Sequence, residues 1–148
     1  MSTTHTPKTR ASMRPPIQLA ASDAERLSAL ALRCETGAPQ VAELLFTELE
    51  RARIRPDAAL PADVVRPGSR VAFVDESHGE RRTVTLVYPA EADIAAGRVS
   101  VLTPIGVGLL GLSPGQTILW PDREGARRTL RILSVSPPEA ISPGGGAG

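Results

Sequence analysis

The chain has 148 residues, of which 41% are hydrophobic and 22% are charged. This composition is typical of a small globular protein and excludes a large multidomain enzyme, a fibrous repeat and a wholly disordered chain. The net charge of +1 depends on Lys8, Arg10 and Arg14 in an acid-free segment, and acids outnumber bases in the remainder. Because only 3% of the residues are aromatic, we expect no platform on which bases could stack. Because the rest of the chain has no cationic excess to neutralise phosphates, we also expect no direct sequence-specific binding of nucleic acid.

The cysteine count and the hydropathy pattern bear on the compartment. Cys34 is the only cysteine, so an internal disulfide and a multi-cysteine metal site are excluded. The chain contains no apolar run of about 20 residues and no apolar segment of the secretory type behind its basic N-terminus. We therefore expect a soluble, cytoplasmic protein without a membrane partner.

The two ends of the chain have the composition of disordered tails. Residues 1–16 are rich in Ser, Thr and Pro, and residues 137–148 end in a glycine-rich run. Neither end can bury enough apolar area to offset the conformational entropy lost on folding. We predict a disordered N-terminal tail and a flexible C-terminal tail.

Residues 17–55 predict a short antiparallel helical hairpin, or coiled coil. Ser22 and Glu25 have the spacing of a capping box, and Leu27 begins an apolar stripe of helical period. Gly37 supplies a helix stop, and a second apolar stripe ends before Pro56. Each helix would be about 20 Å long at 1.5 Å per residue.

The rest of the chain predicts a linker followed by a sheet domain. Three prolines within residues 56–67 favour an extended linker. Residues 68–136 then contain five runs with strand composition and a short apolar helical segment over residues 105–112. The fold class is α+β: a helical hairpin followed by an antiparallel sheet domain with one crossing helix. The five predicted strands are Arg70–Asp75, Thr83–Tyr88, Val99–Leu102, Gln116–Trp120 and Arg128–Val135.

The sequence offers no convincing catalytic, cofactor-binding or metal-binding residues. The run from Gly106 to Gly111 matches the glycine spacing of a dinucleotide fingerprint, but the surrounding βαβ unit and the downstream acid are missing. We interpret these glycines as positions where a helix packs closely on a sheet. No nucleophile elbow or zinc-binding spacing is present, so we expect no enzyme activity, no cofactor and no metal.

Four segments resemble the C-terminal domain of the bacterial Gre transcript-cleavage factors. They are VVRPGSRVAF, TLVYPAEAD, GRVSVLTPIGVGLLGLSPGQTILW and TLRIL, and they span most of residues 65–135. The order of the two units, together with the motifs Asp23–Arg26 and Glu48–Ala52, is similar to the Rnk branch, the regulators of nucleoside diphosphate kinase. The resemblance implies an FKBP-like sheet domain that binds RNA polymerase at the rim of its secondary channel.

The resemblance also implies how this chain would differ from a cleavage factor. Gre factors carry acidic side chains to the catalytic magnesium of polymerase at the tip of a long coiled coil. Here the predicted helices are several times shorter, and the tip, Glu35, Thr36 and Gly37, holds one carboxylate. We therefore expect a non-enzymatic regulator that competes with Gre factors at RNA polymerase without stimulating cleavage. Nucleoside diphosphate kinase levels would be influenced only indirectly.

The polymerase-binding candidates implied by the resemblance form one loop. They are Thr103, Pro104, Ile105 and Gly106, with Leu109 just beyond. The alternative interpretation of residues 103–109 is a buried loop that joins sheet to helix. Two alternative functions also remain: a prolyl isomerase, because the resemblance implies an FKBP-like fold, and a direct binding regulator of nucleoside diphosphate kinase.

Overall fold

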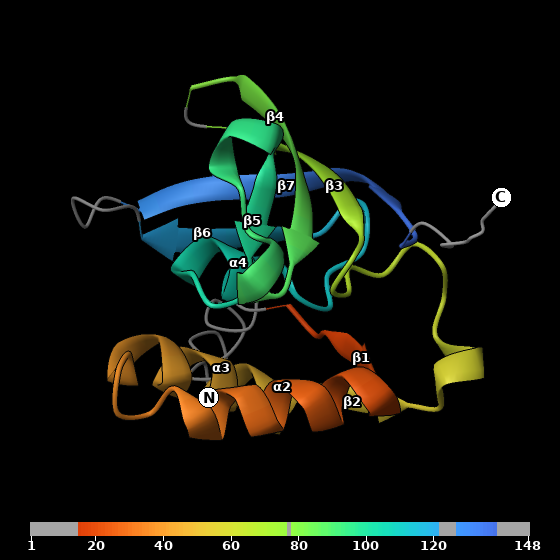
Figure 1. Cartoon of the computed structure of the whole chain (residues 1–148). Helices are drawn as coiled ribbons and strands as arrows, with labels where there is room; N and C mark the ends of the chain where they lie inside the picture. Colours follow the sequence, from red (N-terminus) through yellow and green to blue (C-terminus); the bar gives the residue numbers. More distant parts are fainter. Residues whose placement is uncertain (1–14, 77, 122–126, 139–148) are drawn as a thin grey trace, which may run out of the picture.

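The computed structural model describes residues 15–76, 78–121 and 127–138, so most of both predicted tails lies outside the described part (Figure 1). The prediction of mixed α and β structure is confirmed. A five-stranded sheet has the strand order β5-β4-β3-β7-β6. Its strands are β3 (Arg70–Asp75), β4 (Glu80–Val87), β5 (Arg98–Ser100), β6 (Thr117–Pro121) and β7 (Arg127–Ser136).

The prediction of a purely antiparallel sheet is wrong, because β5 pairs in parallel with β4. Between β4 and β5 the chain forms two 3₁₀ turns, η3 (Pro89–Glu91) and η4 (Ile94–Ala96). They return the chain so that β5 can run beside β4 in the same direction. A parallel neighbour needs such a crossover, whereas an antiparallel one needs only a tight turn. The sheet is therefore mixed.

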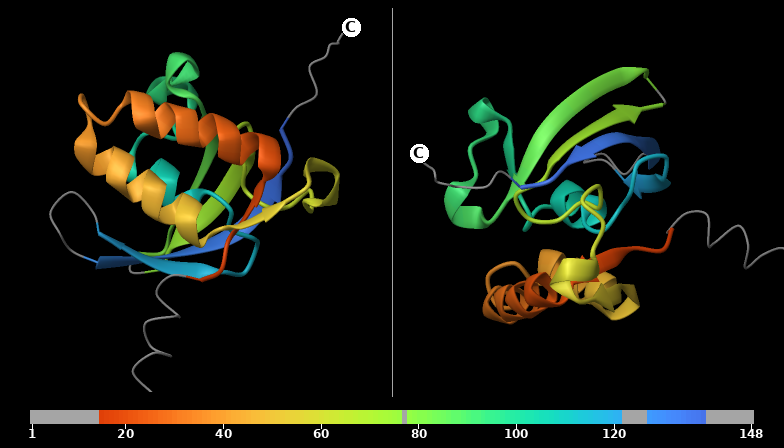
Figure 2. Two further views of the ribbon diagram at one scale, coloured as in Figure 1. Left: turned by 90° about the horizontal axis from the view of Figure 1, so that it is seen from below. Right: turned by 90° about the vertical axis from the view of Figure 1, so that its right-hand side faces the viewer.

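Two helices lie against one face of this unit. Helices α2 (Ala21–Arg33) and α3 (Pro39–Arg51) are joined by residues 34–38 and lie side by side (Figure 2). The short helix α4 (Pro104–Leu109) lies between the helix pair and the sheet (Figure 2). Leu27 and Leu45 of the helix pair belong to the same fully buried core as Leu86 and Leu109 of the sheet unit. The helix pair is thus packed side-on against the body.

A second, two-stranded sheet was not predicted. Strand β1 (Gln18–Ala20) pairs in parallel with β2 (Arg53–Arg55), so the chain just before α2 is joined to the chain just after α3. The backbone N–H of Gln18 also donates to the carbonyl of Gly111 at 3.2 Å. These strands are too short to show the period-2 alternation by which a strand is recognised in a sequence.

The segment predicted as a linker runs along the body. It contains a 3₁₀ turn, η2 (Asp57–Ala59), and then buries Val64 and Val65 completely. The backbone N–H of Val65 donates to the carbonyl of Leu112, and its carbonyl accepts from the N–H of Gly111, each at 2.9 Å. Residues 64–65 are therefore part of the core connection between the helix pair and the sheet unit.

The predicted capping box at Ser22 and Glu25 is wrong. The N-cap residue of α2 is Ala20, which has no side-chain cap, and a carboxylate from η2 takes over that role. Asp57 accepts hydrogen bonds from the backbone N–H and from the hydroxyl of Ser22. These hydrogen bonds lower the pKa of Asp57, and a negative charge at a helix N-terminus is stabilised by the helix dipole.

We predict that Asp57→Ala lowers the melting temperature at neutral pH and that the difference shrinks in acid. The carboxyl group has a lowered pKa in the folded state, so its contribution is present at neutral pH and is lost as pH falls through the folded-state pKa. Thermal unfolding followed by circular dichroism between pH 7 and about pH 2 measures this difference. Asp63→Ala, at an exposed acid of the same segment, is the matched control. A difference that is independent of pH would contradict the prediction.

A buried ion pair fixes α2 to the segment before β3. The carboxylate of Asp23 accepts from Nε of Arg66 at 2.9 Å and from Nη2 at 3.3 Å. The Asp23 side chain is only 8% exposed and that of Arg66 is 29% exposed. Removal of one partner leaves the other with a desolvation cost and no hydrogen-bond partner to offset it.

We predict that Asp23→Ala destabilises the protein by about 1–3 kcal/mol, because Arg66 would lose both hydrogen bonds in a partly buried position. The control is Glu76→Ala, which breaks the exposed Glu76–Arg131 pair and should cost about 1 kcal/mol or less. Urea unfolding of both variants gives the two free energies. Equal losses would show that the Asp23–Arg66 pair does not hold α2 in place.

Candidate functional site

The loop that carries the polymerase-binding candidates is held by its own hydrogen bonds. Thr103 is the N-cap residue of α4: its hydroxyl accepts from the backbone N–H of Gly106 at 3.0 Å and donates to the carbonyl of Ser100 at 2.8 Å. Pro104 follows at the first helical position, where its missing N–H costs nothing. The loop therefore has a defined shape at the end of β5.

The five candidates differ in exposure. Pro104 is exposed, and Thr103 and Ile105 are half-buried. Gly106 is buried, and Leu109 is fully buried in the core. A partner that approaches this loop meets the surface formed by residues 103–105, which we call the α4 loop surface. Because its side chain is buried in the core, Leu109 is not presented to a partner in the folded chain, contrary to its selection as a contact candidate.

Gly106 is where the chain passes very close to a neighbouring backbone segment. A Cβ atom at this position would lie 2.1 Å from the backbone carbonyl oxygen of Ser100. No side chain fits at that distance without moving the backbone. The interpretation of this glycine as a close-packing position is therefore confirmed.

We predict that Gly106→Ala destabilises the protein by about 2–3 kcal/mol, because α4 must move away from the end of β5. Gly37→Ala is the matched control: nothing lies within 4 Å of the point that its Cβ atom would occupy, so its effect should stay within about 0.5 kcal/mol. Urea unfolding measures both. A tolerated Gly106→Ala would show that the α4 loop can shift freely.

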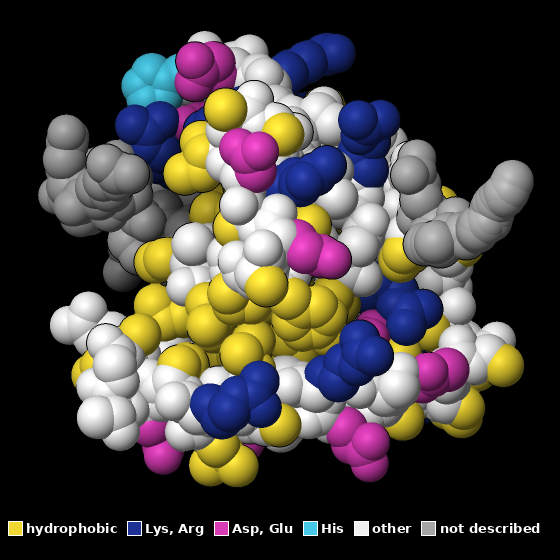
Figure 3. Space-filling model, viewed as in Figure 1, with side chains coloured by type: hydrophobic (Ala, Val, Ile, Leu, Met, Phe, Trp, Pro, Cys, Tyr) yellow, Lys and Arg dark blue, Asp and Glu magenta, His cyan; other side chains and the backbone are white. Residues whose placement is uncertain are grey.

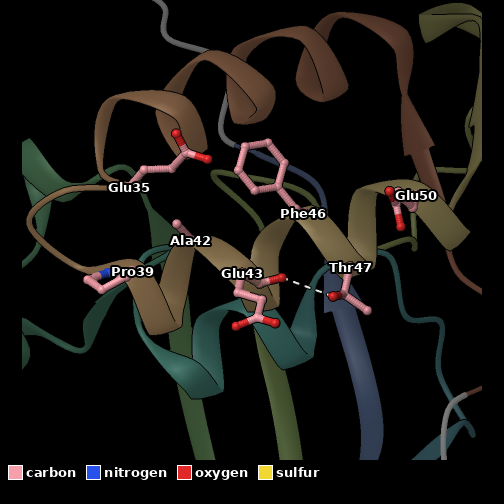
Figure 4. A pocket seen from close by; sticks show the side chains of 7 residues that line it. All are labelled: Glu35, Pro39, Ala42, Glu43, Phe46, Thr47 and Glu50. Atoms are coloured by element: carbon pink, nitrogen blue, oxygen red, sulfur yellow. Dashed lines mark hydrogen bonds between the residues drawn. The ribbon is translucent and has the colours of Figure 1, made fainter.

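The tip of the helix pair is exposed and carries a single carboxylate. Glu35, Thr36 and Gly37 all face solvent in the turn between α2 and α3. Glu35 lines a shallow hollow along α3 that also includes Glu43, Glu50 and the half-buried ring of Phe46. Figure 4 shows Glu43 and Glu50 at separate positions along α3 and Glu35 outside this helix, so the three carboxylates are not gathered at one point. Among the described residues, no group of three acidic, histidine or cysteine side chains could hold a metal ion.

A second hollow lies between α2 and η3, and the sequence patterns did not predict it. It is lined on the helix side by Arg26, Leu30 and Arg33 and on the other side by Tyr88 and Pro89. The guanidinium carbon of Arg26 lies 5.8 Å from the centre of the Tyr88 ring, a cation–π contact. Burial is the main cause that raises the pKa of Tyr88. The helical spacing of the two arginines was visible in the sequence, but their proximity to η3 was not.

Comparison with known proteins agrees with this architecture. Residues 60–137 match the family described as the GreA/GreB transcription elongation factor C-terminus, and residues 15–54 match the Rnk N-terminus. The chain belongs to the GreA/GreB family, in its Rnk branch. The boundary between the two matches falls within the segment that connects the helix pair to the sheet unit.

Individual relatives support the same assignment. The regulator of nucleoside diphosphate kinase from Escherichia coli K12 is 38% identical over 128 residues, which is 86% of this chain and 94% of the relative. The transcription elongation factor GreA of Acidiphilium cryptum is 36% identical over 59% of this chain but only 55% of its own length. The solved GreA/GreB elongation factor of Nitrosomonas europaea is 37% identical, with a TM-score of 0.67 over 82% of this chain and 98% of that one.

Within residues 15–138, apart from the gaps at 77 and 122–126, no helix has both the length and the apolar composition that a membrane crossing requires.

Proposed function

We propose that this protein is a non-enzymatic regulator that binds RNA polymerase near the secondary channel and competes there with Gre factors. It does not stimulate transcript cleavage, and it influences nucleoside diphosphate kinase levels through transcription. Family membership supports a polymerase partner, because the relatives include elongation factors. The α4 loop surface is the polymerase contact.

The length and placement of the helix pair carry the proposal that cleavage is not stimulated. Each helix has 13 residues, which corresponds to about 20 Å. Both helices pack side-on against the body through Leu27 and Leu45, so only part of their length can extend beyond it. The turn supplies one carboxylate, Glu35, whereas a hard divalent cation needs several oxygen ligands at once.

The α4 loop surface has the properties of a small docking site. It combines the exposed ring of Pro104 with the half-buried side chain of Ile105, and both are fixed by the Thr103 cap. A preformed apolar contact loses little conformational entropy on binding. Its position beside α3, which packs against α4, also brings the helix pair close to whatever the loop contacts.

We predict that the full chain displaces a Gre factor from core RNA polymerase and that Ile105→Arg weakens its binding by at least about tenfold, since the substitution places a charge in an apolar contact. Competition with a labelled Gre factor measures displacement, and a halted elongation complex reports cleavage, which should stay at its basal rate. In cells, the same variant should lose any effect on kinase levels.

The control variant is Ile54→Arg, at a half-exposed isoleucine of β2 on the helix-pair side. It should compete as the unmodified chain does. Failure of the full chain to bind polymerase at micromolar concentration, or stimulated cleavage, would overturn the proposal. Prolyl isomerase turnover, or co-purification with the kinase in the absence of polymerase, would favour one of the two alternatives instead. A prolyl isomerase would use a pocket lined by several aromatic side chains. Here Phe73 lies in the core and does not line the hollow that includes Tyr88.

A further inference from the structure

The hollow between α2 and η3 is an apolar groove with a basic edge. Ala29, Leu30, Tyr88, Pro89 and Ala90 form its walls. Figure 3 shows apolar side chains gathered between α2 and the sheet unit on this face, with Lys or Arg side chains along the lower edge. We call this surface the α2–η3 groove.

The basic edge consists of two arginines that have no acidic partner within the described part of the chain. Arg26 and Arg33 are both exposed and form no ion pair there, whereas Arg51, Arg66, Arg128 and Arg131 all do. None of the described residues that line the groove is acidic. Arg26 is held over the Tyr88 ring, so it is partly ordered before any partner arrives.

The spacing along α2 fits a helical partner. Arg26 and Arg33 are seven residues apart, two turns of helix and about 10.5 Å, and so they lie on one face. Ala29 and Leu30 occupy the same face between them. The small side chain of Ala29 lets another backbone approach closely, and Leu30 supplies the apolar contact. A helix laid along α2 would meet both arginines with its carboxylates, if it carried two of them seven residues apart.

We propose that the α2–η3 groove binds an acidic amphipathic helix of a partner protein, with aliphatic side chains on Leu30 and Pro89 and two carboxylates on Arg26 and Arg33. This mode of recognition uses an apolar groove for affinity and charge pairs at its edge for orientation. The proposal does not depend on polymerase binding, because the groove shares no residue with the α4 loop surface.

The test uses the full chain and a fluorescein-labelled, alanine-rich helical peptide that carries two leucines and, seven residues apart, two glutamates on the same face. Fluorescence anisotropy should show saturable binding with a dissociation constant below about 500 µM, because a shallow groove with two exposed charge pairs supports weak affinity. Raising the salt concentration from about 50 to 500 mM should weaken binding, since the pairs are screened. A peptide with glutamine in place of glutamate should bind at least fivefold more weakly.

Two kinds of variant examine the groove itself. The double variant Arg26→Gln/Arg33→Gln removes the basic edge and should weaken binding of the glutamate peptide at least fivefold. Ala29→Tyr fills the groove without changing charge and should weaken both peptides. The matched control is Arg81→Gln/Arg82→Gln, which removes two exposed arginines of β4 and should bind like the unmodified chain. Circular dichroism melting confirms that each variant is folded.

Several outcomes would overturn the proposal. The first is that the glutamate peptide does not bind at 500 µM. The second is that the glutamine peptide binds as tightly as the glutamate peptide. The third is that the Arg81/Arg82 control loses as much binding as the Arg26/Arg33 variant. Full competition by a single-stranded RNA oligonucleotide would identify a general anion site instead. Self-association of the chain that the Arg26/Arg33 variant abolishes would make a second copy, and not a foreign helix, the occupant. Each of these results is independent of whether the chain competes with Gre factors.

Discussion

The structure depends on the apolar contact between the helix pair and the sheet unit. Leu27, Ala31 and Leu45 are completely shielded from solvent and belong to the same core as the side chains of β3, β4 and α4. Burial of large aliphatic side chains such as leucine is worth roughly 1.5–3 kcal/mol each. The Asp23–Arg66 pair and the Asp57 cap then fix the direction of α2 on this surface. The helix pair is consequently one of the packed layers of the protein and not a separate projecting arm.

This arrangement explains why two surfaces face outward from one small body. The α4 loop is shaped by the close approach of Gly106 to Ser100 and by the Thr103 cap, so its exposed residues sit on a fixed support. The α2–η3 groove exists because α2 crosses the body next to the turn after Tyr88. One surface is apolar and compact, and the other combines apolar walls with a basic edge. They suit partners of different chemistry.

Much of the fold followed from local patterns in the sequence. The helical stripes and strand composition located the helix pair and the strands of the large sheet, and β3 has the predicted bounds. Long-range pairings were not accessible in this way. Asp57 is 35 residues from Ser22, and only the folded chain shows that it displaces the expected capping box. The parallel pairing of β5 also depends on a crossover whose direction no local pattern encodes.

The same distinction holds for the candidate sites. The family motifs identified residues 103–106 as one loop, and the structure adds that Leu109 is turned into the core. The α2–η3 groove could be recognised only in the three-dimensional structure, because Arg26 and Tyr88 are distant in sequence and meet only when α2 packs on the sheet unit.

The pairing of β1 with β2 limits how this architecture can be recombined. Both strands flank the helix pair, and β1 is also bonded to the chain beside Gly111. If the helices were exchanged for a longer coiled coil, both flanking strands would have to be kept. Without them, the β1–β2 pairing and the backbone hydrogen bond from Gln18 to Gly111 would be lost. The two units are therefore poor interchangeable modules, and a chimeric protein joined at residue 56 would inherit an uncovered apolar face.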